Sequence, residues 1–454
     1  MPAAQSPAQS SAQSPAQSSA QSPAQSSAQS PAQSSAQSPP PPPAELFTPA
    51  FHQDPHRALA ELRQTAPAVP VVTPNGLRTW LVTGYEHARE LLADPRLSKD
   101  MRVGKDLIPR NFADPEKQRA FLAEAGDHAQ FPQVLSMHML DSDPPDHTRL
   151  RRLVGRAFTA RRVEALRPRI TGLTDELLEN IAADGTVDLM EALAFPVPFT
   201  VICWLLGVPP DDRASFRRWS NLLVSGAGTE EVRDASVSMI AYLRALIDGK
   251  RAEPADDMLS DLVQVSDEGD QLSDDELISM AFLLLVAGHE TTVNLIGNGT
   301  LAVLGHPRVR EQLAADPSLW PAAVEEFLRY DGPVTNATWR FTTEPVEVGS
   351  VVIPEGEFVT ISLGAAGRDP ARYPDPDRLD IGRPHSASVA FGHGIHHCLG
   401  APLARLEGQI VISRLFARFP GLRLATDASR LRWRSSLMMR GLEELPVFTG
   451  EDTV

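Results

Sequence analysis

The sequence predicts a mainly α-helical protein with small β-sheets, and three observations lead to this fold class. Apolar residues follow helical spacing through most of the chain from about residue 85 to about residue 335. Short β-branched segments bounded by turn residues come before and after that region, at residues 71–83 and 346–363. The chain has 454 residues, of which 42% are hydrophobic, so it can bury a sizeable core.

Residues 1–44 have a composition that argues against folding. From Ala4 the octad Ala-Gln-Ser-Pro-Ala-Gln-Ser-Ser occurs four times and leads into the proline run Pro39–Pro43. This segment has no apolar face to bury and favours the polyproline II conformation. We expect a disordered tail that acts as a spacer or aids solubility, or alternatively one that binds a proline-reading partner. Residues 45–454 are then expected to form a single domain.

Turn residues divide the regions on either side of the helical part into short elements. The folded part begins near Phe51 and continues with a helix over His56–Thr65. Asn75-Gly76 between two β-branched segments predicts a hairpin turn. The expected strands are Val71–Thr73, Thr79–Thr83, Val346–Val348, Val351–Ile353 and Phe358–Leu363.

The longest predicted helix starts at a capping box, Ser273–Glu276, and follows an apolar pattern over Leu277–Leu304 until Gly305-His306-Pro307 ends it. At 1.5 Å per residue it would be about 45 Å long. Because it is apolar on nearly every face, we expect it in the centre of the fold. Inside it lies Ala287–Thr292, a run of small and polar residues where packing alone would favour Leu or Val.

One of the two cysteines, Cys398, lies in a glycine-rich loop just before a predicted helix, Leu399–Gly408. Pro402 is tolerated in that helix only in its first turn. Backbone N–H groups at a helix N-terminus stabilise a thiolate, so Cys398 is suited to bind a metal ion. The alternatives are a buried structural cysteine and a zinc cluster with His393, His396 and His397, although adjacent histidines rarely converge on one tetrahedron.

The loop resembles the haem-binding signature of the cytochrome P450 family, Phe-Gly-x-Gly-x-His-x-Cys-x-Gly. The fixed positions of that motif are Phe391, Gly392, Gly394, His396, Cys398 and Gly400. The resemblance implies the P450 fold across residues 45–450, with haem b (iron protoporphyrin IX) between the long central helix and the helix of the cysteine loop. It also implies that Cys398 binds the iron and that Phe391, Gly392 and Gly400 lie against the haem.

In the long helix the same resemblance implies an oxygen-activating motif. Ala287 and Gly288 would give haem or O2 room beside the helix backbone. Thr291 would supply a hydroxyl group and Glu290 an acid connected to solvent, because the reduction of bound O2 consumes protons. The alternative is an ordinary buried threonine and a salt-bridged glutamate, and His289 is expected to be a partly exposed helix residue.

Further matches concern the scaffold and the haem propionates. Glu326 and Arg329 lie one turn apart on a helix, and the family pattern joins them to a later arginine, here Arg378, in a buried triad. By resemblance, the residues that contact the propionates are His147, Arg151, Arg340 and His396; each could instead be a solvated charge. Arg149, Arg152 and Arg156 are expected to form a basic patch that docks an acidic electron donor.

The sequence favours a three-component monooxygenase. No glycine-rich dinucleotide fingerprint follows a predicted strand, and two cysteines cannot supply the four thiolates of an iron-sulfur cluster. Electrons from NAD(P)H would therefore arrive through a ferredoxin reductase and a ferredoxin, and O2 would be the co-substrate. A non-catalytic haem-thiolate sensor is the alternative from another class, but it gives no reason for Glu290 and Thr291.

The motifs resemble those of actinomycete macrolide and polyketide hydroxylases. We therefore expect hydroxylation or epoxidation of a hydrophobic secondary metabolite, with steroid, terpenoid and peptide substrates as alternatives. The segments Lys105–His138 and Asn221–Thr229 are candidate lids. By analogy with the family, the pocket walls include Ala287, Val334, Asn336, Ala337, Leu437 and Met438.

Composition excludes several other classes of protein. With 42 Lys and Arg against 58 Asp and Glu, the net charge is −16, which argues against general binding to nucleic acid or anionic membranes. Cys203 and Cys398 are the only cysteines, so a disulfide framework is not expected. We find no apolar run long enough for a membrane anchor and no signal peptide, and expect a cytoplasmic monomer.

Overall fold

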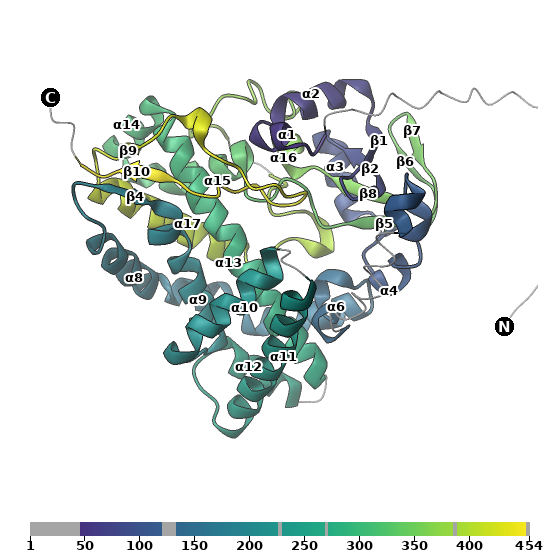
Figure 1. Ribbon diagram of the computed structural model, residues 1–454, viewed down its shortest axis with the longest axis horizontal. Helices are drawn as coiled ribbons and strands as arrows, with labels where there is room; N and C mark the ends of the chain where they lie inside the picture. Colours follow the sequence, from purple (N-terminus) through teal and green to yellow (C-terminus); the bar gives the residue numbers. More distant parts are fainter. Residues whose placement is uncertain (1–45, 120–132, 226–228, 268–270, 385–387, 451–454) are drawn as a thin grey trace, which may run out of the picture. The chain divides into compact units, whose positions relative to one another are not determined.

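The structure is a computed structural model that describes residues 46–119, 133–225, 229–267, 271–384 and 388–450 (Figure 1). The expected disordered tail, residues 1–44, lies outside the described residues. So do the central parts of both candidate lids, residues 120–132 and 226–228.

Helices dominate the described part of the chain, as the sequence predicted. The α-helices are α1 Pro49–Gln53, α2 His56–Thr65, α3 Tyr85–Ala93, α4 Met101–Gly104, α6 Asp146–Ala157, α7 Ala160–Ala165, α8 Arg167–Glu179, α9 Pro196–Leu206, α10 Arg213–Ser225, α11 Thr229–Ala252, α12 Met258–Asp267, α13 Asp274–Leu304, α14 Pro307–Ala315, α15 Trp320–Asp331, α16 Leu363–Gly367 and α17 Ala401–Arg418. A π-helical segment, η4, spans Met190–Ala194, and 3₁₀ turns include η2 Gln133–Ser136 and η7 Gly394–His396.

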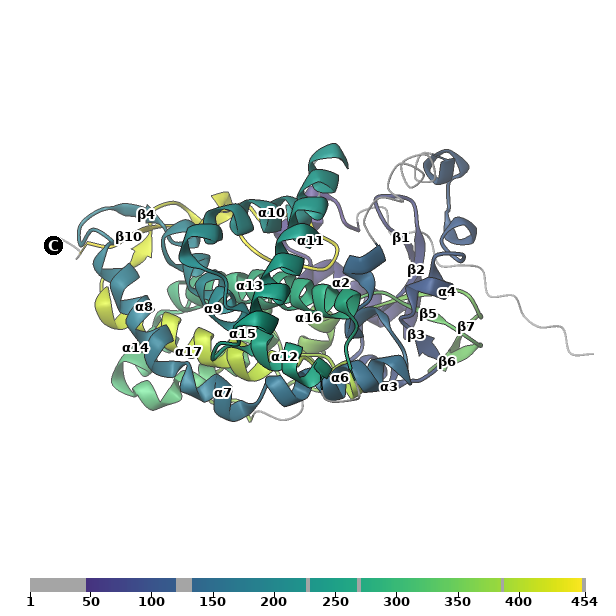
Figure 2. The same ribbon diagram turned by 90° about the horizontal axis from the view of Figure 1, so that it is seen from below.

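The strands form three small sheets. They are β1 Ala68–Val72, β2 Arg78–Val82, β3 Leu97–Ser98, β4 Thr186–Asp188, β5 Arg340–Thr342, β6 Val346–Val348, β7 Val351–Ile353, β8 Phe358–Ile361, β9 Arg423–Leu424 and β10 Pro446–Phe448. The largest sheet has the order β1-β2-β8-β5-β3, in which only the β2–β8 pairing is parallel. The other sheets are β4-β10-β9 and the β6–β7 hairpin. In Figures 1 and 2 the largest sheet lies to one side of the helical body, close to α1, α2 and α3.

The predicted strand positions are confirmed with small shifts at their ends. β1 begins at Ala68 rather than Val71, and its hairpin turns through Gly76, whose φ is +92°. A positive φ favours glycine, which explains why the Asn-Gly pair indicated this turn. β8 ends at Ile361, two residues before the expected end, because the Ser362 side chain accepts a hydrogen bond from the Ala365 amide and begins α16.

Helix α13 is the central element, and its predicted start is confirmed. The Ser273 side chain accepts a hydrogen bond from the Glu276 amide, and the Glu276 side chain accepts one from the Ser273 amide. The helix packs against α9, α11, α15 and α17, and Figures 1 and 2 both show it inside the helical body. Glycine lets α13 and α17 pack closely together, since a Cβ at Gly299 would lie 2.8 Å from Ile412 of α17.

The length and hydropathy of α13 also satisfy the requirements for crossing a membrane, although the sequence pattern suggested no such stretch. However, 78% of its most apolar window is buried inside the fold. A stretch of this kind is typical of the core helix of a globular protein, since the neighbouring helices already cover its apolar surface.

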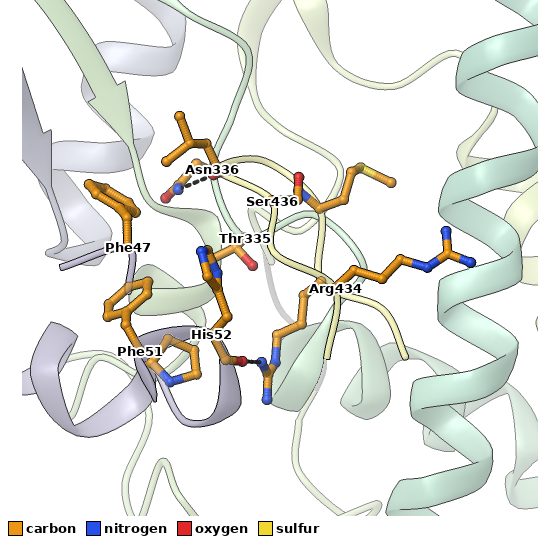
Figure 3. Close-up of a pocket in the computed structure, with 11 residues that line it drawn as sticks. Phe47, Phe51, His52, Thr335, Asn336, Arg434 and Ser436 are labelled. Carbon is orange, nitrogen blue, oxygen red and sulfur yellow. Dashed lines mark hydrogen bonds between the residues drawn. The ribbon is translucent and has the colours of Figure 1, made fainter. Parts of the chain in front are cut away.

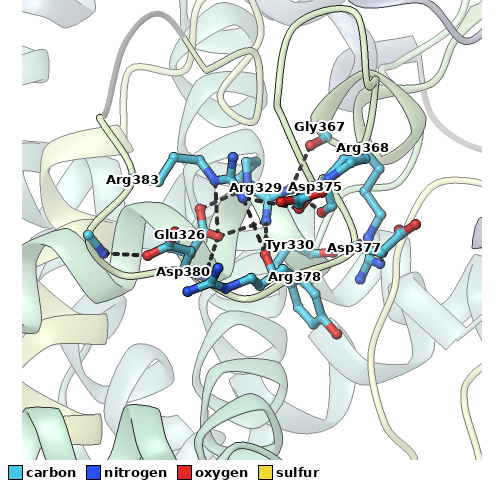
Figure 4. Close-up of polar contacts among 12 residues, drawn as sticks. Glu326, Arg329, Tyr330, Gly367, Arg368, Asp375, Asp377, Arg378, Asp380 and Arg383 are labelled. Atoms are coloured by element: carbon cyan, nitrogen blue, oxygen red, sulfur yellow. Dashed lines mark hydrogen bonds and ion pairs between the residues drawn. The ribbon is translucent and has the colours of Figure 1, made fainter.

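A buried ion-pair network fixes the segment that leads into the cysteine loop (Figure 4). Arg329 donates to both carboxylate oxygens of Glu326, at 2.8 and 2.7 Å, and both side chains are almost fully buried. The backbone N–H of Asp380 donates to Glu326 at 2.8 Å, and Arg329 donates to the Gly367 carbonyl at 2.9 Å. These bonds anchor the chain after α16 on helix α15.

The third arginine of this network is Arg383, not Arg378 as predicted. The Nε atom of Arg383 lies 3.5 Å from Glu326, and its side chain is only 10% exposed. Arg378 is exposed and contributes its backbone carbonyl, which accepts from Arg329 at 3.1 Å. The chain turns between these two positions, so the side chain that returns to Glu326 comes from five residues further along.

We predict that Arg383→Gln lowers the free energy of unfolding of the protein by about 1–3 kcal/mol, because it removes a charged partner from a buried carboxylate. Arg378→Gln is the matched control and should change stability by less than about 0.5 kcal/mol, as exposed substitutions do. Urea unfolding followed by circular dichroism measures both. Equal effects of the two variants would contradict this assignment.

Candidate functional site

The cysteine loop is a tight turn that closes on itself. The backbone N–H of Cys398 donates to the Phe391 carbonyl at 2.9 Å. Gly392 and Gly394 have φ values of +75° and +72°, a region that residues with side chains rarely adopt. A Cβ at Gly394 would lie 2.9 Å from the Cα of Ala93 at the end of α3. The loop therefore needs glycine both for its backbone and for its contact with α3.

Cys398 lies just before α17, which begins at Ala401 rather than at Leu399. Gly400 precedes the first turn with ordinary right-handed backbone angles, and Pro402 occupies the first turn as predicted. Cys398 is exposed to solvent, although many protein atoms surround its sulfur.

Several groups act on the Cys398 thiol. Burial is the largest influence and raises its pKa, since it disfavours the charged form. The backbone N–H groups of Gly400 and Ala401 donate to the sulfur, and Arg151 and Arg405 are positive charges nearby; all four lower the pKa. The donors at the helix start are thus in place, and a bound metal ion would complete the deprotonation.

The sulfur side of the loop is packed with aromatic and charged groups. The guanidinium of Arg405 lies 4.4 Å from the centre of the Phe391 ring and also pairs with Glu325 of α15. Arg151 donates from Nη2 to the His397 carbonyl at 2.6 Å. Arg151 therefore holds the cysteine loop itself, a contact that the sequence did not indicate.

A cluster of buried basic groups lies near the loop. His147 of α6 and His396 of η7 have ring centres 4.3 Å apart, and Arg340 of β5 is almost fully buried. Lys99, directly after β3, is only 2% exposed. Among the described residues, both ring nitrogens of His147 and the Nζ atom of Lys99 lack a hydrogen-bond partner.

The pKa values of the cluster reflect this crowding. Burial and the neighbouring cations lower the pKa of His396 to about 2, and the same two causes lower that of Lys99 to about 7. Burial lowers the pKa of Arg340 to about 10. Unpaired buried cations cost free energy, and a ligand with two carboxylates would pair with them. The donor set thus fits the propionates of a haem whose iron Cys398 would bind.

Lys99 is the member of this cluster that the sequence reasoning missed. A single lysine between Ser98 and Asp100 is usually exposed and carries no spacing signal. Its burial depends on the antiparallel pairing of β3 with β5. This pairing places Lys99 beside Arg340, which lies 241 positions later in the chain. Only the folded sheet shows that contact.

The expected basic patch is only partly on the surface. Arg149 pairs with Glu276 at the start of α13 and donates to the Gln271 carbonyl at 2.8 Å, so it joins two elements of the fold. Arg152 and Arg156 of α6 are exposed.

On α13 the polar run makes a series of local hydrogen bonds. The Thr291 hydroxyl donates to the Ala287 carbonyl at 2.9 Å, and the Thr292 hydroxyl lies 3.4 Å from the Gly288 carbonyl. Such bonds to the preceding turn loosen a helical ladder. The side chain of Ala287 is exposed, although most of the helix is buried. Glu290 accepts a hydrogen bond from Arg434 at 2.6 Å.

Two expectations for this run were wrong. His289 is buried, not partly exposed: its ring packs edge-on against both Phe195 and Phe199, and its Nδ1 atom is 2.7 Å from the Leu285 carbonyl. A Cβ at Gly288 would lie 2.9 Å from Ile202. Gly288 therefore lets α9 approach α13, whereas Ala287 faces open space.

The predicted pocket walls come together from two segments. The backbone N–H of Thr335 donates to the Met438 carbonyl at 2.8 Å, and the Asn336 side chain donates to the Leu437 carbonyl at 2.5 Å. Val334 bridges to Met439. The two segments also line a small pocket beside α1, in which Asn336 lies near Phe47 (Figure 3).

The side chains of these walls face different ways. Leu437 packs with Phe47 and Phe51 against the first helices, and Ala337 is buried in the core beside the largest sheet. Met438 is 39% exposed. Leu437 and Ala337 thus pack into the core of the protein, whereas the apolar side chain of Met438 is accessible to solvent.

The amino-acid sequence was compared with protein families and with characterised proteins. The family model "Cytochrome P450" matches residues 228–426. Cytochrome P450 107B1 of Saccharopolyspora erythraea is 52% identical over 89% of this chain and 97% of that protein. Vitamin D(3) 25-hydroxylase of Pseudonocardia autotrophica is 51% identical over 89% of this chain and 96% of that protein.

A solved structure agrees with these relatives. The tirandamycin C-bound P450 monooxygenase TamI superimposes with a TM-score of 0.79 at 48% identity, over 88% of this chain and 99% of that one. The identity is high and extends over nearly the whole described body, including the long helix and the cysteine loop. This chain therefore belongs to the cytochrome P450 family of monooxygenases.

Proposed function

We propose that this P450 is a cytoplasmic, monomeric enzyme that hydroxylates or epoxidises a hydrophobic secondary metabolite, with a macrolide or polyketide as the preferred class. It would use haem b, O2 and electrons that pass from NAD(P)H through a ferredoxin reductase and a ferredoxin. The observation that carries the proposal is the combination of two backbone N–H groups that donate to the Cys398 sulfur and a nearby cluster of buried basic groups, of which Lys99 and His147 lack hydrogen-bond partners.

The haem would be held at both its iron and its carboxylates. Cys398 would bind the iron, and Lys99, His147, Arg151, Arg340 and His396 would pair with the propionates. When bound, the haem supplies the chemistry of O2 activation and oxygen transfer.

Two residues in the polar run of α13, Glu290 and Thr291, would take part in proton transfer. The Thr291 hydroxyl already donates to the Ala287 carbonyl, so its oxygen remains able to accept a further hydrogen bond. Glu290 is a carboxylate one residue away, 12% exposed and paired with Arg434. We assign Glu290 to proton delivery, and Thr291 to positioning the group that has received a proton, whose hydrogen the Thr291 oxygen would accept.

The electron donor would dock near α6, where Arg152 and Arg156 are exposed close to the residues that contact the cysteine loop. Arg149 is not part of that surface, since it is committed to Glu276. An acidic ferredoxin suits this patch by charge.

The substrate class rests on the relatives and on the apolar lining. A 6-deoxyerythronolide B hydroxylase is 44% identical to this chain, which supports a macrolide-type substrate. The vitamin D(3) 25-hydroxylase is 51% identical and makes a steroid-like substrate the second candidate. Val334 and Met438 offer apolar contacts to either class.

Spectroscopy and turnover together test the function. The ferrous-CO complex should show the long-wavelength Soret band of a thiolate ligand, and Cys398→Ser should abolish it. Titration with 6-deoxyerythronolide B and with vitamin D3 should shift the spin state for the preferred class. Product formation with NADPH and a surrogate ferredoxin pair should follow. A thiolate spectrum without product from any substrate would favour the sensor alternative.

We predict that Lys99→Met speeds the transfer of haem to apomyoglobin about tenfold, because a charged hydrogen bond to a buried carboxylate is worth at least about 1.5 kcal/mol. Lys105→Met is the control, since Lys105 is exposed and outside the cluster. Transfer is followed by the Soret band of myoglobin. Equal transfer rates for the two variants would remove Lys99 from the propionate site.

We predict that Thr291→Ala raises the peroxide released per NADPH about fivefold, since loss of one hydrogen bond of about 1 kcal/mol shifts the partition of bound O2. Thr292→Val is the control, because Thr292 is buried and its hydroxyl contacts the Gly288 carbonyl. Peroxide is assayed with horseradish peroxidase. Coupling unchanged in Thr291→Ala would contradict the assigned role.

A further inference from the structure

The partner of Glu290 comes from the loop that carries the predicted pocket walls. Arg434 donates from Nη1 to Glu290 at 2.6 Å, and its backbone N–H donates to the Gly441 carbonyl at 2.9 Å. Trp433 and Leu442 form a bridge one step further along the hairpin. Residues 435–440 are therefore a loop that is closed at its base by backbone hydrogen bonds, and Arg434 lies at that base.

The other end of the same loop is firmly anchored. Arg440 is buried, pairs with Asp331 at the end of α15 and donates to the His52 carbonyl at 2.8 Å. Its guanidinium lies 3.6 Å from the centre of the Trp433 ring. Asn298 of α13 donates to the Arg440 carbonyl at 3.0 Å.

The two arginines differ in exposure. Arg434 is 42% exposed, whereas its partner Glu290 is 12% exposed. In Figure 3 the Arg434 side chain extends away from the wall formed by Phe47 and Phe51. A carboxylate that is largely removed from water needs a hydrogen-bond donor, and that donor also holds it in one rotamer. Arg434 supplies that donor while keeping its own charge in contact with solvent.

We propose that Arg434 is a positioning residue for proton delivery, which holds the Glu290 carboxylate in its productive orientation on α13. This inference rests on the acid role assigned to Glu290 above. The roles proposed for the cysteine loop and for the cluster of buried basic groups do not depend on this inference. Among the contacts described, Arg434 touches neither of them.

The hairpin offers a matched control. Arg432 lies two residues earlier, pairs with Glu443 at 2.8 Å and is 66% exposed. Arg432 also lies 3.7 Å from Glu444, so Arg432→Gln removes the same side chain and two ion pairs from the same hairpin without touching Glu290.

The experiment measures peroxide released per NADPH oxidised by the haem-loaded protein, with a surrogate ferredoxin and reductase and no added substrate. Arg434→Gln should raise that ratio about two- to fivefold, as expected for loss of an ion pair whose arginine is partly exposed to solvent. Glu290→Gln should raise it to a similar level. In Arg434→Lys the increase should be at most half of that seen in Arg434→Gln. The ratio for Arg432→Gln should equal that of the wild type.

The double variant Glu290→Gln/Arg434→Gln decides whether Arg434 acts through Glu290. A ratio equal to that of Glu290→Gln alone supports the proposal, because residues that act as one unit are not additive. Additive effects, or a wild-type ratio for Arg434→Gln, overturn it. The CO spectrum and the thermal unfolding midpoint check folding. If Arg434→Gln loses the thiolate band, the same cycle is run with Arg434→Lys.

The outcomes separate this inference from the proposed function. If Glu290→Gln raises peroxide but Arg434→Gln does not, only the positioning role of Arg434 is lost. If Glu290→Gln and Thr291→Ala both leave the ratio unchanged, the acid role itself is wrong, and the inference is overturned with it.

Discussion

The geometry of this site depends on the hydrogen bonds that hold Cys398 at the start of α17. Two backbone amides point at the sulfur, and the bond from Cys398 to the Phe391 carbonyl closes the loop around it. Burial opposes the thiolate, so the protein alone does not favour a free charge there. A cation bound by the sulfur would offset that cost. The hydrogen bond from Arg151 to the His397 carbonyl connects the cysteine loop to α6.

Helix α13 combines two demands that are usually met by different elements. Its glycines bring α9 and α17 close, which makes it the packing centre of the molecule. Yet at Ala287 and Thr291 the same helix faces open space and carries polar groups. The hydroxyl and imidazole groups of the run bond to carbonyls of the preceding turn, so these three side chains need no hydrogen-bond partner from another element, whereas Glu290 is paired with Arg434.

The sequence predicted the fold and the local motifs well, because those depend on neighbouring residues. The capping box, the Asn-Gly turn and the glycine-rich cysteine loop are all local patterns. It did not predict Arg383, Lys99 or Arg434, whose contacts join positions far apart in the chain. Arg383 replaced Arg378 because a turn reorders which side chain reaches Glu326, and His289 is buried because the aromatic rings of Phe195 and Phe199 cover it.

The closed base and the buried anchor of the C-terminal loop divide its residues into two groups. Arg434 and Arg440 are committed to Glu290 and Asp331, while Met438 between them is exposed. The side chain at position 438 can vary in size while both ends of the loop keep their contacts. Changes at this position can therefore alter the apolar surface of the loop without breaking the ion pairs Arg434–Glu290 and Arg440–Asp331.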